Sequence, residues 1–91
     1  MINPEFLKNL RNKLNNTTSF PSVYMFKFIV PDDPEKLVKV QNLFGSEAEL
    51  SYNKSRSGNY ICVTGKEVML NADEVIRRYK KAFNIKKIIS L

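Results

Sequence analysis

The stretch Val23-Tyr24-Met25-Phe26-Lys27-Phe28-Ile29-Val30 decides the fold of this chain. Its residues are almost all aromatic, β-branched or otherwise apolar, a composition that favours a β-strand. Successive side chains of a strand point to opposite sides, so the large apolar residues at every second position from Tyr24 to Val30 share one face. The alternate positions include Lys27. We therefore expect a strand with one buried face and one mixed face.

A turn and a helix are predicted directly after this strand. The segment Pro31-Asp32-Asp33-Pro34 ends the strand, and Asp33 is expected to cap a helix whose first residue is Pro34. Apolar residues at helical spacing then run from Leu37 to Phe44. Gly45 is expected to close the helix, since glycine readily takes the left-handed conformation just past a helix end.

The second half of the chain predicts two more strands, a helix and a final strand. Alternating apolar and polar residues indicate strands, and a polar segment with Gly58 indicates a hairpin turn. Asn71 followed three residues later by Glu74 is typical of a helix start. The expected elements are a strand at 48–53, a turn at 55–59, a strand at 60–68, a helix from Asn71 to Asn84, and a strand at 85–91.

Residues 1–19 are predicted to form an N-terminal helix and a polar linker, separate from a domain at residues 20–91. Asn3 is the expected cap and Pro4 the first helical residue, and residues 15–19 are polar enough to form the linker. Ninety-one residues with 43% apolar and 26% charged side chains fit one domain. The sequence leaves open whether the N-terminal helix covers the sheet.

The predicted order of elements in residues 20–91 is β, α, β, β, α, β. Both crossover connections must be right-handed, so both helices lie on the same side of one four-stranded antiparallel sheet. This is the ferredoxin-like α+β arrangement. It predicts a sheet whose second face has no helical cover from the core fold itself.

Two motifs resemble those of the YbeD-like family, small bacterial proteins of unknown function. The first is Phe20-Pro21-x-x-Tyr24-x-Phe26-Lys27, and the second is Lys54-Ser55-x-x-Gly58-Asn59-Tyr60-x-Cys62-Val63-Thr64. The resemblance covers about residues 20–91 and implies the same ferredoxin-like fold, similar in shape to ligand-sensing ACT domains. It implies no catalytic residues. Cys62 stands where other members often carry serine, which argues against an obligatory hydroxyl there.

The residue content excludes several kinds of catalytic site. The chain has no histidine, which rules out a histidine-assisted nucleophile and a histidine-containing zinc site. Its three glycines are too scattered for a nucleotide-binding loop, and Cys62 is expected to be structural. Asp32 and Asp33 are better explained by capping than by a metal site. We therefore expect no enzyme activity, no catalytic residue, no metal and no cofactor.

The leading hypothesis is a regulatory or interaction domain that binds a small ligand or a protein through the open sheet face. Lys27 and Lys54 are the predicted anion partners, and Tyr60 is the predicted amphipathic contact. Ser55 belongs to a polar turn that either holds an anion or is simply solvated. The full predicted set is Lys27, Lys54, Ser55, Tyr60 and Thr64. A homodimer through this face is a further alternative.

The alternative hypothesis is nucleic-acid binding, in particular RNA, through a basic C-terminal surface. The net charge is +6, and the predicted surface comprises Arg77, Arg78, Lys80, Lys81, Lys86 and Lys87. Helix ion pairs of Asp73 with Arg77 and of Glu74 with Arg78 are expected to neutralise two of these cations in part. Asn59, Ile61 and Thr64 stand where RNA-recognition modules carry the aromatic residues that stack on bases.

The expected location is the cytoplasm. No apolar run is long enough to cross a bilayer, and the N-terminus lacks the pattern of a signal peptide. A lone cysteine agrees with a reducing compartment. We therefore expect no membrane partner.

Overall fold

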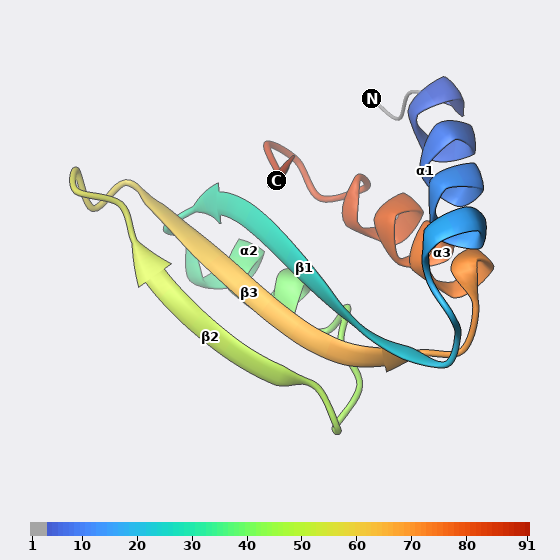
Figure 1. Ribbon diagram of the computed structural model, residues 1–91. Helices are drawn as coiled ribbons and strands as arrows, with labels where there is room; N and C mark the ends of the chain where they lie inside the picture. The colour runs from blue at the N-terminus through green and yellow to red at the C-terminus, as the bar shows by residue number, and fades with distance from the viewer. Residues whose placement is uncertain (1–3) are drawn as a thin grey trace.

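Four strands form one open antiparallel sheet, accompanied by three helices, in a computed structural model that describes residues 4–91 (Figure 1). The strands lie in the order β2-β3-β1-β4, with the long β1 and β3 in the centre. This α+β arrangement is compatible with a ferredoxin-like fold. In chain order the elements are α1 (Pro4–Thr17), β1 (Ser22–Pro31), α2 (Pro34–Gln41), β2 (Glu49–Lys54), β3 (Tyr60–Met69), α3 (Ala72–Ala82) and β4 (Ile89–Ser90).

The central strand β1 has the two-faced pattern that the sequence predicts. It pairs with β3 along its whole length, from Ser22 opposite Met69 to Pro31 opposite Tyr60. Phe26 and Phe28 are fully buried, whereas Lys27 between them and Met25 before them are exposed. The alternation of side chains along a strand therefore separates a core face from an outer face.

Aromatic side chains from both helical connections reach the core face of β1. The Tyr79 ring of α3 lies 5.3 Å from the Phe26 ring and 6.0 Å from the Phe28 ring, measured between centroids. Phe44, which follows α2, lies 5.9 Å and 6.3 Å from the same two rings. The Tyr79 hydroxyl is 2.9 Å from that of Tyr24. Burial, together with this hydrogen bond, raises the pKa of the Tyr79 phenol above its usual value.

Helix α1 packs against α3 and does not lie on the outer face of the sheet (Figure 1). Its Leu7 and Leu14 are buried in the common core. Phe6 meets the Tyr79 ring edge-on at 6.3 Å, and Arg11 Nε lies 3.0 Å from Asp73 Oδ1 of α3. The N-terminal helix is therefore a packed part of the domain.

The predicted linker at residues 15–19 is in part helical, because α1 continues to Thr17. The Thr17 hydroxyl donates to the Lys13 carbonyl at 2.6 Å, so this polar side chain bonds to the helix that it ends. The Asn3 cap predicted for this helix lies outside the described residues.

Both predicted caps of the crossover helices are confirmed. The Asp33 side chain accepts a hydrogen bond from the Glu35 amide at 2.9 Å, with Pro34 at the start of α2. The Asn71 side chain accepts from the Glu74 amide, also at 2.9 Å. Each side chain satisfies an amide that the first helical turn leaves without an internal partner.

The predicted role of Gly45 as a left-handed helix cap is wrong. Helix α2 already ends at Gln41, and the glycine with positive φ among residues 4–91 is Gly58, at 77° in the hairpin turn. The Gly45 amide instead donates to the Glu67 carboxylate at 3.3 Å. A Cβ at Gly45 would lie 2.8 Å from Glu67 Oε2, so the absence of a side chain permits this close approach.

The final strand is much shorter than the predicted 85–91. β4 comprises Ile89 and Ser90, which pair with Ile29 and Phe28 of β1. Ile85 is instead buried in the core, and the chain turns at Lys87, whose φ is 65°. The need to bury Ile85 just after α3 thus overrides the local preference of this segment for strand.

Candidate functional site

The outer face of the sheet, here called the open face, is defined by the register of its strands. It is opposite the face on which Phe26 and Phe28 meet Phe44 and Tyr79, and Val23, Met25 and Lys27 are exposed on it. The register assigns to this face Val23, Met25, Lys27 and Ile29 of β1, Tyr60, Cys62, Thr64, Lys66 and Val68 of β3, Glu49, Ser51 and Asn53 of β2, and Ile89 of β4.

Apolar side chains that are exposed or half-buried gather at both ends of the open face. At one end Val23 and Val68 are direct cross-strand partners, 63% and 56% exposed, with Met25 beside them. At the other end Ile29 is the partner of both Cys62 and the exposed Ile89. Single exposed apolar residues are common, but adjoining groups of them are typical of interaction surfaces.

A polar row separates these two apolar ends and contains two of the predicted site residues. Lys27 and Thr64 are cross-strand partners, and Ser51 of β2 is the next partner along the row. Lys27 is exposed and Thr64 is half-buried. The structure therefore brings Lys27 and Thr64 together at the centre of the open face.

Lys54 does not join Lys27 on this face. It is the partner of Ile61, whose side chain is buried in the core, so Lys54 projects from the opposite side of the sheet. Its Nζ lies 3.2 Å from the Asp32 carboxylate. The positive charge of Lys54 is thus matched within the domain, and the two lysines do not form one anion site.

The hydroxyl of Ser55 is used within the hairpin turn. It accepts a hydrogen bond from the Tyr60 amide at 3.2 Å and lies 3.1 Å from the Ser57 hydroxyl. Beside the turn is a shallow hollow of about 240 Å³, lined by Ile29, Asn53, Lys54, Ser55, Tyr60 and Cys62. Lys54, Ser55 and Tyr60 therefore border one hollow near the end of the open face, although the Lys54 side chain projects from the other side of the sheet.

Arg78 does not belong to the predicted basic surface, because its side chain points inward. Its Nη1 lies 2.7 Å from Glu67 Oε1, and the two side chains are only 15% and 16% exposed. The guanidinium also lies 5.4 Å from the centre of the Phe26 ring and 5.2 Å from that of Phe44. Arg78 is therefore a structural cation that joins α3 to β3.

The two predicted helix ion pairs are wrong as well. Asp73 binds Arg11 of α1, and the Glu74 carboxylate accepts a hydrogen bond from the Leu70 amide at 2.5 Å. Arg11 of another helix and the amide of Leu70 just before α3 thus replace the predicted partners at i+4. Within residues 4–91, no carboxylate lies within salt-bridge distance of the remaining predicted cations, Arg77, Lys80, Lys81, Lys86 and Lys87.

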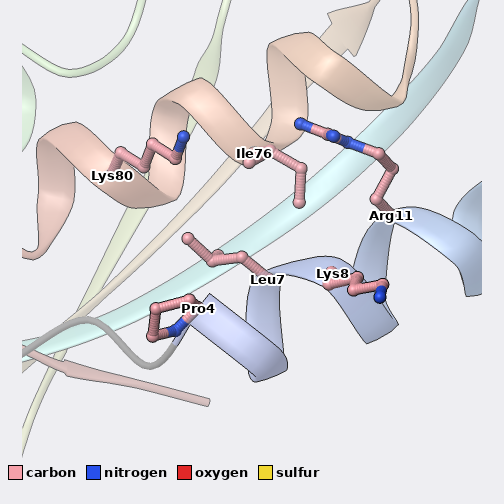
Figure 2. Close-up of a pocket in the computed structure, with 6 residues that line it drawn as sticks. All are labelled: Pro4, Leu7, Lys8, Arg11, Ile76 and Lys80. Carbon is pink, nitrogen blue, oxygen red and sulfur yellow. The ribbon is translucent and has the colours of Figure 1, made fainter.

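A second hollow lies between α1 and α3, on the helical side of the domain (Figure 2). It has a volume of about 280 Å³ and is lined by Pro4, Leu7, Lys8, Arg11, Ile76 and Lys80. Leu7 and Ile76 are almost fully buried where the helices meet, and the cations surround them. The sequence does not predict this hollow, because the hollow depends on how α1 packs against α3.

The sequence predicts only part of the two apolar ends of the open face. The alternation along β1 identifies Met25 and Ile29, but Val68 and Ile89 join them through pairings between distant segments. The signal present in the sequence was the run of apolar residues at both odd and even positions of β1. A strand with one wet face usually shows a cleaner alternation.

Within the described residues, no cluster of three or more His, Cys, Asp or Glu side chains is suited to holding a metal ion. No helix among them has the length and apolar character needed to cross a membrane. No protein-family model matches the chain, and no curated protein or solved structure is significantly similar to it.

Proposed function

We propose that this protein is a non-enzymatic interaction domain with a ferredoxin-like βαββαβ fold, and that it binds a partner protein through the open face. The observation that carries the proposal is the pair of apolar ends, the exposed Val23 with Val68 and the half-buried Ile29 with the exposed Ile89. Adjoining apolar side chains on a paired sheet form a surface that gains free energy when a partner covers it.

The proposed fold is supported by the order of the elements and by the strand order β2-β3-β1-β4. Membership of the YbeD-like family is part of the same proposal and has its support in the two motifs. Phe26 of the first motif is buried in the core, and Gly58 of the second has the positive φ that the hairpin turn requires.

Apolar contact with the open face does not by itself supply enough free energy to bind a partner. Fully burying a side chain such as Val or Met contributes about 1.5–3 kcal/mol, and these side chains are already about half covered, so each would add about 1 kcal/mol. Four or five of them would supply about 5 kcal/mol, near the lower limit of what association costs. A partner must therefore also use the polar row with Lys27 and Thr64.

Placing charges in an apolar end is expected to abolish partner binding without unfolding the domain. In the variant Met25→Asp with Ile29→Asp, two carboxylates would have to be desolvated in the interface, so retention of the partner should fall at least tenfold. Immobilised protein and extract of its native host, followed by quantitative mass spectrometry, measure the retention. Circular dichroism reports the fold.

The matched control is Val38→Asp, because Val38 is 51% exposed on α2, away from the open face. It adds an exposed carboxylate without touching the proposed surface. Equal loss of binding in the control, or unchanged binding in the double variant, would contradict the proposed function.

Nucleic-acid binding is a second candidate function, favoured by the five cations without a carboxylate partner described above. If all five contact phosphates of a single strand, the logarithm of the binding constant should fall by roughly 3–4 for each tenfold rise in salt. Filter binding of a short RNA over a range of salt concentrations measures this slope. Absence of RNA retention at low salt would eliminate this candidate.

A further inference from the structure

The centre of the open face carries a cation between apolar groups. Lys27 lies between Met25 and Ile29 along β1, and its cross-strand partner is Thr64. In the part of the chain that the structure describes, no carboxylate lies within salt-bridge distance of Lys27. The carboxylate on this face, Glu49, is the cross-strand partner of Lys66. Along β1 a ligand therefore meets Met25, Lys27 and Ile29 in that order, and Lys66, the cross-strand partner of Met25, is a second cation of the face.

This charge pattern disfavours a second copy of the chain as the occupant. In a symmetric dimer, the Val23 end of one copy would stack on the Ile29 end of the other. The two-fold axis of such a dimer passes close to Lys27. Two Lys27 ammonium groups would then face each other across the interface centre. Like charges in that position are costly, so a partner with a carboxylate at its centre fits better.

The spacing of Met25 and Ile29 on the open face fits a helix. The aromatic contacts from both helical connections are on the core face, and a helix is one of the elements that pack on the other face of a sheet. Met25 and Ile29 are four strand positions apart, which corresponds to about 13 Å. A helix covers that distance in about nine residues, and positions i, i+4 and i+7 or i+8 share one of its faces.

We propose that the open face binds an acidic amphipathic helix of a partner protein. Its apolar residues at i and i+7 or i+8 contact the two apolar ends, and an Asp or Glu at i+3 or i+4 lies opposite Lys27. The Thr64 hydroxyl donates a hydrogen bond to the same carboxylate. This inference rests on the proposed function and specifies the chemistry of the partner.

Selection of displayed random 16-residue peptides on the full-length protein tests the inference. Enriched peptides are expected to carry the acidic residue midway between the two apolar positions. Lys27→Glu should weaken their binding at least tenfold in fluorescence anisotropy, and replacing the peptide acid with lysine should restore binding to that variant. Lys13→Glu on α1 is the control, since it changes the net charge equally and leaves the open face intact.

The other outcomes separate the inference from the proposed function. Enriched peptides that lack the acid, and that lose binding with Met25→Asp, overturn the inference and support the function. Peptides insensitive to both Lys27→Glu and Met25→Asp overturn both. If no peptide is enriched, sedimentation velocity of the protein shows whether it is a dimer or a monomer. A dimer broken by Met25→Asp makes a second copy the occupant and overturns the inference, and a monomer overturns both proposals.

Discussion

Replacing Phe26 with alanine is expected to lower the free energy of unfolding by about 3–5 kcal/mol. Its side chain is fully buried and lies within ring-contact distance of Tyr24, Phe28, Phe44 and Tyr79. Removing the ring therefore leaves a cavity bordered by both helical connections. Because small domains are stable by only about 5–15 kcal/mol, the variant should be partly unfolded or close to it.

Urea denaturation followed by circular dichroism measures this loss, and Met25→Ala is the matched control. Met25 is the neighbouring residue of β1, but its side chain is 48% exposed on the other face. Its truncation should lower the free energy of unfolding by about 1 kcal/mol or less. Similar losses for the two variants would mean that the assignment of the faces of β1 is wrong.

Truncating Arg78 to alanine is expected to destabilise the domain by about 2–4 kcal/mol. The substitution removes the 2.7 Å ion pair with Glu67 and the guanidinium that lies over the Phe26 and Phe44 rings. It also leaves the largely buried Glu67 carboxylate without its cation, which is the main cost of breaking such a pair. The expected value is below that of a fully buried pair because both side chains retain some exposure.

The adjacent Arg77→Ala is the control for this variant, because Arg77 is exposed and its truncation should change stability by about 0.5 kcal/mol at most. A double-mutant cycle with Glu67→Ala should give a coupling energy of about 1–3 kcal/mol. Equal effects of the two arginine substitutions in denaturation experiments would show that Arg78 is an ordinary surface residue.

The elements that could be predicted from sequence are those fixed by local chemistry. Asp33 and Asn71 cap helices through hydrogen bonds to amides two and three residues away, so the residues involved stand together in the sequence. The alternation along β1 likewise follows from neighbouring residues. The predicted end of α2 and the predicted length of β4 are wrong, because the contact of Gly45 with Glu67 and the burial of Ile85 depend on distant segments.

The candidate site depended more heavily on such distant contacts. Lys27 and Thr64 are brought together by the pairing of β1 with β3, which the predicted strands implied. The position of Lys54 behind the sheet required the register of β2, because a shift of one residue moves a side chain to the other face. Arg78 required knowledge of Glu67, a partner from a different element.

The carboxylate of Glu67 connects regions of the domain that serve different candidate partners. It forms an ion pair with Arg78 of α3, and the neighbouring Arg77 belongs to the basic surface. It also accepts a hydrogen bond from the amide of Gly45, which lies four residues before β2 begins; β2 borders the open face. If the guanidinium were withdrawn, the Gly45 amide would remain as a hydrogen-bond donor to this carboxylate. The packing of α3 on the sheet and the segment that leads into β2 thus depend on the same acid.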